Sequence, residues 1–194
     1  MEQFLSLPKN EIIKTELEAS KSRFLGFARH IETEQQAQEF LDDLRKEYKD
    51  ARHICFAYKL LNTSRASDDG EPSGTAGKPM LDIIDKLELY NVIVVIVRYF
   101  GGVKLGAGRL LRTYATSASD TLKQKQVLWE KCLEKELILN FLEYQTLQKQ
   151  LNKIKIKVLE TDFSDNVKVK ISVSASENFS LGKEISSKEI WEHF

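Results

Sequence analysis

The sequence predicts a protein of the α+β class that is divided into two domains. Its 194 residues suffice for one large domain or two small ones. Its 42% hydrophobic and 30% charged residues are typical of a soluble globular protein with a core. Strand-like and helix-like patterns occur on both sides of Val127, so we expect a first domain over residues 1–127 and a second over residues 128–194.

The first domain opens with two strands and a helix. Residues 12–18 and 23–30 alternate between apolar and polar side chains, as strands do. Thr33 and Gln36 have the spacing of a capping box, in which side chains satisfy the free N–H groups at a helix start. The helix that follows carries apolar residues at helical spacing, namely Ala37, Phe40, Leu41 and Leu44.

Strands and helices alternate along the rest of this domain. Residues 53–61 predict a strand with two faces, one made by Ile54, Phe56, Tyr58 and Leu60 and the other by His53, Cys55, Ala57 and Lys59. A proline in its first turn favours a helix over residues 79–91. The β-branched run at 92–97 is typical of a central strand covered on both faces. A further helix follows over residues 106–125.

The second domain has a different order of elements. We expect strands at 133–141, 154–161 and 167–173, helices at 143–152 and 178–187, and a short terminal strand. This β-α-β-β-α-β order is the split arrangement of ferredoxin-like domains.

Composition restricts the classes of partner. The 29 basic residues equal the 29 acidic ones, so the net charge does not indicate a polyanionic partner. Every arginine precedes residue 113, which confines arginine-based anion recognition to the first two thirds of the chain. Two cysteines, Cys55 and Cys132, favour buried thiols over a disulfide framework. No targeting or membrane-spanning pattern is visible, so we expect a cytoplasmic protein.

Two glycine-bearing segments, residues 67–79 and 98–109, are the candidates for a functional surface. They hold seven of the nine glycines, and concentrated glycine indicates special backbone angles or close approach to another molecule. The second segment fits neither a Walker loop nor a dinucleotide-binding loop. It does place Lys104, Arg109 and Arg112 around a helix start, which could hold a phosphate. The alternative is a tight strand-to-helix turn with solvated cations.

The first segment contains the ingredients of hydrolytic chemistry in Ser67, Asp68, Asp69, Glu71 and Ser73, with His53 nearby in sequence. A nucleophile elbow is missing. His53 and Cys55 could form a catalytic pair, or Cys55 could be an ordinary buried thiol. The three acidic residues could bind Mg²⁺ or Ca²⁺ through oxygen, but they also suit turns and helix caps, and we expect no metal and no cofactor.

Nucleic-acid binding is indicated by cations interleaved with aromatic residues. Arg98, Tyr99 and Phe100 stand beside the cations of the second segment, so this stretch could contact phosphates and stack on bases. The alternative is that the two aromatic residues belong to the core.

Five stretches together resemble the YigZ/IMPACT family over about residues 15–125. They are Ser22-Arg23-Phe24, the stretch from His53 to Tyr58, the stretch from Ser67 to Gly77, the stretch from Val97 to Gly106, and Leu111-Arg112-Thr113-Tyr114. The tail from about residue 133 resembles the small C-terminal domain of bacterial members.

The resemblance implies the folds of the two domains and a role in translation. The first domain is expected to be similar to the second domain of ribosomal protein S5, and the second to the ferredoxin-like last domain of elongation factor G. Eukaryotic relatives act in translational control through a partner that regulates a stress kinase, and bacterial members are expected to bind RNA or a ribosome component. The family commonly has a second glycine where Arg109 stands. Arg109 therefore either strengthens anion binding or blocks close approach of a ligand.

The leading hypothesis is a module that binds RNA, the ribosome or another translation component. Phosphates would be contacted by Lys78, Arg98, Lys104, Arg109 and Arg112. The adjoining groove would be lined by Ser67, Asp68, Asp69, Glu71, Ser73, Thr75, Gly101 and Gly102. A hydrolase using the acidic loop with His53 or a divalent ion, and a protein–protein adaptor, are the alternatives. Binding is favoured over catalysis because the sequence contains no complete nucleophile–base or metal-ligand pattern.

Overall fold

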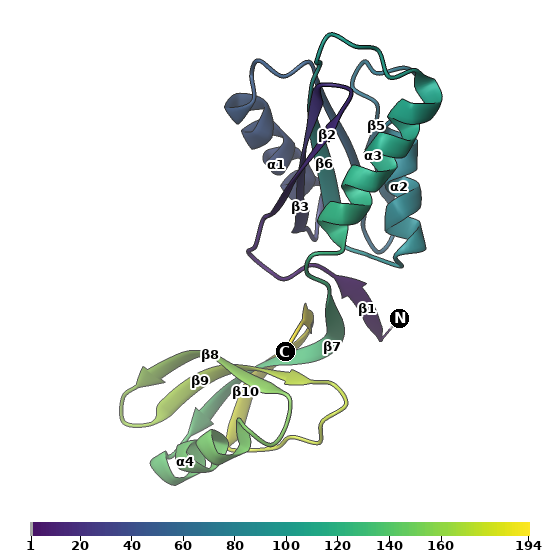
Figure 1. The fold of residues 1–194 in the computed structure, drawn as a ribbon. Helices are drawn as coiled ribbons and strands as arrows, with labels where there is room; N and C mark the ends of the chain where they lie inside the picture. Colours follow the sequence, from purple (N-terminus) through teal and green to yellow (C-terminus); the bar gives the residue numbers. More distant parts are fainter. Residues whose placement is uncertain (1) are drawn as a thin grey trace. The chain divides into compact units, whose positions relative to one another are not determined.

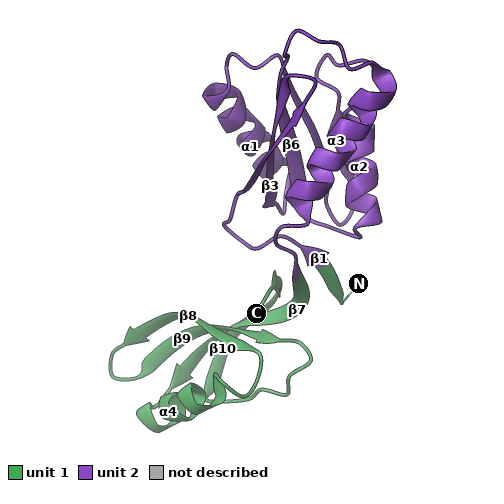
Figure 2. Ribbon diagram, in the orientation of Figure 1, with its two compact units in different colours: residues 1–4, 128–194 green, residues 5–127 purple. Residues whose placement is uncertain are grey.

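A computed structural model describes residues 2–194 and divides the chain into two compact units (Figures 1 and 2). The larger unit comprises Leu5–Val127, and the smaller unit comprises residues 128–194 together with the first few residues of the chain. The larger unit ends at Val127. The start of the chain differs, because β1 (Gln3–Ser6) pairs with β7 (Val127–Leu139).

The larger unit is built on an antiparallel five-stranded sheet. Its order is β2-β3-β6-β4-β5, with β2 at Ile13–Ala19, β3 at Ser22–His30, β4 at His53–Lys59, β5 at Ser64–Ser67 and β6 at Val92–Tyr99. Strand β6 lies in the middle, and every one of its residues except Tyr99 is buried. The predicted central strand is therefore confirmed, since a β-branched run suits a strand with no solvent-facing side.

Helices cover both faces of this sheet (Figure 1). Helix α1 (Glu34–Glu47) packs against one face, in a core cluster that includes Phe56. Helices α2 (Gly77–Lys86) and α3 (Ala107–Leu122) pack against the other face, in a cluster that includes Cys55. The predicted alternation along β4 is confirmed, because successive residues enter opposite cores.

Two details of the helix ends differ from the sequence prediction. Helix α2 ends at Lys86 rather than Asn91, because Glu88 and Asn91 have positive φ angles of 53° and 52°. The capping box at α1 is half formed. The Thr33 side chain accepts from the Gln36 N–H, but the Gln36 side chain accepts from the N–H of Glu32 instead of that of Thr33.

The smaller unit is a sheet with one helix. Strand β7 lies beside β9 (Val167–Ser174), which in turn pairs with β8 (Ile156–Phe163). Strand β10 (Lys183–Glu192) pairs with β7. Helix α4 (Phe141–Gln150) contributes Leu147 to a core with the apolar side chains of β7 and β9.

The second helix predicted in this unit, over residues 178–187, is wrong. Gly182 has a φ of 60°, and a β-carbon there would lie 2.2 Å from the Leu139 side chain, so no helix passes through it. The chain instead enters β10, where Lys135 pairs with Glu184 at 2.8 Å across the strands. The order is β-α-β-β-β, so the second helix of the ferredoxin-like arrangement expected from the sequence is not formed.

Within residues 2–194, no helix is long and apolar enough to cross a membrane.

Candidate functional site

The larger unit contains a pocket of about 420 Å³ where the two glycine-bearing segments meet. Its floor and walls come from the start of β4, the end of β6, the loop before α2 and the start of α3. His53 and Arg98 are register partners on β4 and β6, so the sheet itself brings them together. The lining residues are Arg52, His53, Glu71, Pro72, Arg98, Phe100, Lys104, Leu105, Gly106, Ala107 and Leu110.

Asp68 organises the loop that carries Glu71. Its carboxylate accepts hydrogen bonds from the N–H groups of Gly74 at 2.8 Å, Ala76 at 2.9 Å and Gly77 at 2.8 Å. Partial burial acts to raise the pKa of Asp68, but these backbone bonds outweigh it and lower the pKa. Asp68 therefore holds the loop and the start of α2, which is the turn and cap role given above as the alternative to metal binding.

Asp69 also turns toward the protein. Its Oδ2 accepts from the Ile54 N–H at 2.6 Å, and its backbone carbonyl accepts from His53 Nδ1 at 2.8 Å. The two aspartates thus use their oxygens on backbone N–H groups. In the part of the chain that the structure describes, no group of three or more His, Cys, Asp or Glu side chains has the geometry to hold a metal ion.

Glu71 and Arg98 form a buried ion pair at the pocket. Arg98 Nη1 lies 2.5 Å from Glu71 Oε1, which also accepts from the Tyr114 hydroxyl at 2.8 Å. The Arg98 guanidinium lies over the rings of Phe24 and Phe100 at 5.2 and 5.7 Å. Arg98 is therefore a fixed and neutralised cation, rather than the free phosphate ligand that the sequence suggested.

Cys55 is not paired with His53. Its thiol donates to the Asp68 carbonyl at 3.0 Å, and its Sγ also lies 3.4 Å from the Tyr114 hydroxyl. Burial raises the pKa of Cys55, so the thiol stays protonated at neutral pH. Burial likewise raises the pKa of Tyr114. The ordinary buried-thiol interpretation of Cys55 fits these contacts, and the nucleophile interpretation does not.

The second glycine segment closes over the turn between β2 and β3. A β-carbon on Gly101 would lie 1.9 Å from the Lys21 carbonyl oxygen, so only glycine fits there. The Gly101 N–H donates to the Ser22 hydroxyl at 3.2 Å, which fixes the loop to β3. Phe100, directly before Gly101, lines the pocket and is 41% exposed.

Helix α3 begins at this segment without a side-chain cap. Its N-cap is Gly106, and among residues 2–194 there is no side-chain hydrogen bond that caps the first turn. The first helical hydrogen bond is made by the Leu110 N–H, so the N–H groups of the three preceding residues have no partner within the helix. Of the residues in this first turn, Gly106, Ala107 and Leu110 line the pocket, so the positive end of the helix dipole lies at its wall.

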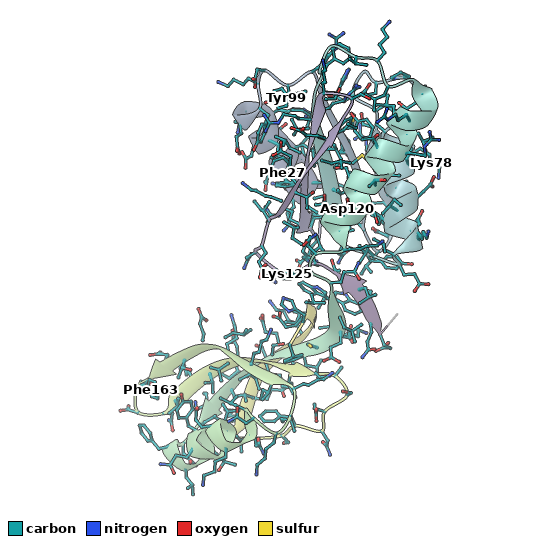
Figure 3. The ribbon with its side chains drawn as sticks, in the orientation of Figure 1. Phe27, Lys78, Tyr99, Asp120, Lys125 and Phe163 are labelled. Carbon is teal, nitrogen blue, oxygen red and sulfur yellow. The ribbon has the colours of Figure 1, made fainter. Side chains whose placement is uncertain are left out.

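The predicted cations are not equivalent. Lys104 is exposed and lines the pocket. Arg109 and Arg112 are exposed on α3, and Arg112 Nη1 lies 3.7 Å from where a β-carbon on Gly108 would be, over the first turn. Lys78 lies on α2 (Figure 3) and pairs with Asp82 at 2.6 Å, and it is not among the residues that line the pocket.

Most of the predicted groove residues support the pocket rather than line it. Of that set only Glu71 lines it; Ser67, Asp68, Asp69, Ser73, Thr75, Gly101 and Gly102 do not. Thr75 is buried and its hydroxyl donates to the Pro72 carbonyl at 2.6 Å. Arg52 is a pocket residue that the prediction missed, although its position directly before His53 on an alternating strand was a usable signal.

Comparisons with known proteins agree with the motif resemblance. A family model described as the Impact N-terminal domain matches residues 20–122. YvyE of Bacillus subtilis, an IMPACT family member, is 38% identical over 168 residues, covering 84% of this chain and 76% of YvyE. YigZ of Escherichia coli is 31% identical over 169 residues, covering 82% of this chain and 81% of YigZ. A crystal structure of a hypothetical protein, 29% identical, gives a TM-score of 0.65 over 91% of this chain and 87% of its own. The chain therefore belongs to the IMPACT family.

Proposed function

We propose that the larger unit binds RNA or an RNA-containing component of translation, with a phosphate held at the start of α3. The observation that carries this proposal is the uncapped first turn of α3, which opens on a pocket that Lys104 also lines. Unpaired N–H groups at a helix start are suited to an anion, and a nearby ammonium adds attraction.

The charges around the pocket support an anionic ligand. Glu71 would repel a phosphate, but its ion pair with Arg98 neutralises it. Arg52 and Lys104 line the pocket as exposed cations, and neither makes an ion pair in the described part of the chain. The balance at the pocket is therefore positive although the whole chain is neutral.

An exposed aromatic ring supports a nucleotide over a bare anion. Phe100 stands at the pocket with 41% of its surface exposed. A ring in this position can stack on an unpaired base, the usual mode of single-stranded RNA recognition. Phe100 was named with Arg98 in the sequence hypothesis, and its exposure favours the binding interpretation over the core interpretation.

The experiment is a binding titration with a short single-stranded RNA at two salt concentrations. We expect affinity to fall with salt, and the slope to flatten by about one ion for each phosphate-contacting cation removed. The test variant is Lys104→Ala with Arg112→Ala. The matched control is Lys78→Ala, since Lys78 is equally basic but is engaged with Asp82. Equal binding by the double variant and the wild type would overturn the phosphate site.

The translational role and a cytoplasmic location are extensions of this proposal from the family resemblance, as is the likeness of the larger unit to ribosomal protein S5. The hydrolase alternative is weakened, because the Asp68 and Asp69 carboxylates accept from backbone N–H groups. The adaptor alternative predicts tight binding of a protein partner that is insensitive to salt. It is therefore separated from RNA binding by the salt dependence measured in the RNA titration.

A further inference from the structure

One oxygen of Glu71 has no hydrogen-bond donor among residues 2–194. Oε1 accepts from Arg98 and Tyr114, whereas the polar atom found near Oε2 is His53 Nε2 at 3.8 Å, beyond hydrogen-bond distance. The Glu71 side chain is only 4% exposed and lines the pocket. A carboxylate oxygen that lies at a pocket and has no donor from the protein can accept a hydrogen bond from a ligand.

His53 presents a second acceptor beside it. Its Nδ1 is hydrogen-bonded to the Asp69 carbonyl at 2.8 Å, and a carbonyl can only accept, so the hydrogen is on Nδ1. With that hydrogen on Nδ1, Nε2 is the ring atom that can accept a hydrogen bond from a ligand hydroxyl. Nε2 and Glu71 Oε2 lie 3.8 Å apart, on residues that both line the pocket. Two adjacent donors, such as the hydroxyls of a vicinal diol, match this pair, whereas a phosphate oxygen does not.

The pocket thus has two chemically distinct parts. Acceptors lie at Glu71 and His53, and donors lie at Lys104 and the first turn of α3. A matching ligand is anionic at one end and donates hydroxyl hydrogens at the other. A volume of about 420 Å³ is in the range of small-molecule pockets, which suits one nucleotide rather than a long strand.

We infer that the pocket takes a ribonucleotide with free 2′ and 3′ hydroxyls, the diol on Glu71 and His53 and the phosphate at the start of α3. This inference rests on the proposed function and narrows it to a single terminal unit. A nucleoside 5′-monophosphate and the 3′ end of an RNA chain offer the same chemistry. Carboxylates bind ribose hydroxyls in other nucleotide sites, which is consistent with the part given to Glu71.

The test uses the unmodified protein and varies the ligand, so that no result depends on a variant folding. Calorimetric titrations compare AMP, 2′,3′-dideoxy-AMP, adenosine and IMP. We expect loss of the diol and loss of the phosphate each to weaken binding at least tenfold, and loss of the base amino group to change little. Equal binding of AMP and dideoxy-AMP would overturn the inference. Weak binding of IMP, with AMP and dideoxy-AMP bound equally, would also overturn the inference, because Glu71 and His53 would then accept from the amino group of the base.

A second set of titrations distinguishes a free nucleotide from the 3′ end of an RNA chain, and it distinguishes this inference from the proposed function. A short RNA and the same RNA ending in a 2′,3′-dideoxynucleotide are titrated at low salt. A tenfold preference for the natural end supports RNA termini, and a preference seen only with AMP supports the free nucleotide. Salt-dependent RNA binding with no preference in either series overturns this inference and leaves the proposed function standing. No binding of any of these ligands overturns both.

His53→Gln provides the protein-side check. We expect it to reduce the preference for AMP over dideoxy-AMP while the preference for AMP over adenosine remains, since the phosphate end is untouched. Lys78→Ala is the matched control and should keep both preferences. An unchanged diol preference in a folded His53→Gln protein would remove His53 from the site.

Discussion

Asp68→Asn is the substitution for which the structure gives the clearest magnitude. One carboxylate oxygen accepts from the N–H groups of Ala76 and Gly77, and the other accepts from that of Gly74. The asparagine amide can keep the first oxygen but places an NH₂ group against the Gly74 N–H. One charge-assisted hydrogen bond is lost and two donors meet, so we expect the free energy of unfolding to fall by roughly 1.5–3 kcal/mol at pH 7.

The pH dependence provides a second check. The pKa of Asp68 is lowered in the folded protein, so its stabilisation is fully present above the unfolded pKa and disappears as pH falls through the folded pKa. The difference between wild type and Asp68→Asn should be constant from pH 7 to pH 5. The difference should shrink below about pH 4, where Asp68 begins to be protonated in the unfolded chain, and disappear once Asp68 is also protonated in the folded protein.

The assay must report on the larger unit. Both tryptophans, Trp129 and Trp191, are in the smaller unit, so urea unfolding should be followed by circular dichroism instead of fluorescence. Asp82→Asn is the control, because its pair with Lys78 is exposed and screened by solvent, so its loss should hardly change the free energy of unfolding. Asp68→Asn within 0.5 kcal/mol of wild type at pH 7, on the order of an ordinary surface substitution, would refute the assigned role of Asp68.

Three further outcomes are expected. Arg98→Met should lower the free energy of unfolding, measured in urea, by roughly 3–5 kcal/mol, because Glu71 is left buried without its ion-pair partner. Adding Glu71→Gln should restore part of that loss, and additive losses in the double variant would contradict the pairing. Gly101→Ala should cost about 3 kcal/mol through overlap with the β2–β3 turn. Gly108→Ala should be neutral or stabilising, because its β-carbon would make only an ordinary contact with the Arg112 side chain at 3.7 Å. A thiol reagent at pH 8 should label the native protein slowly and the denatured protein at once, because burial raises the pKa of both Cys55 and Cys132; rapid native labelling would contradict their burial.

The sequence predicted the larger unit well because its signals are local and mutually consistent. Val92–Val97 could only be a strand buried on both sides, and the alternation along β4 named the two faces correctly. The smaller unit was predicted less well. Residues 178–187 carry a weak helical pattern, and the contacts that make them a strand come from β7, more than forty residues earlier in the chain.

The position of the site could be predicted from the sequence, but the role of each of its residues could not. Glycine density identified the two segments that meet at the pocket. Charge alone could not show that Arg98 is paired with Glu71, which precedes it by 27 residues, while Lys104 is exposed. Nor could it show that the Asp68 carboxylate faces backbone amides. Each of these roles depends on a partner that is distant in sequence.

The central place of β6 bears on how the chain folds during synthesis. Strands β3 and β4 are made early, but β6 separates them in the sheet and is made later. Until Val92–Tyr99 has emerged, both strands have an unpaired edge and apolar faces without a complete core. Such edges favour association with other chains. Closure of this sheet therefore waits for β6, and a nascent chain stalled before β6 is the form most in need of a chaperone.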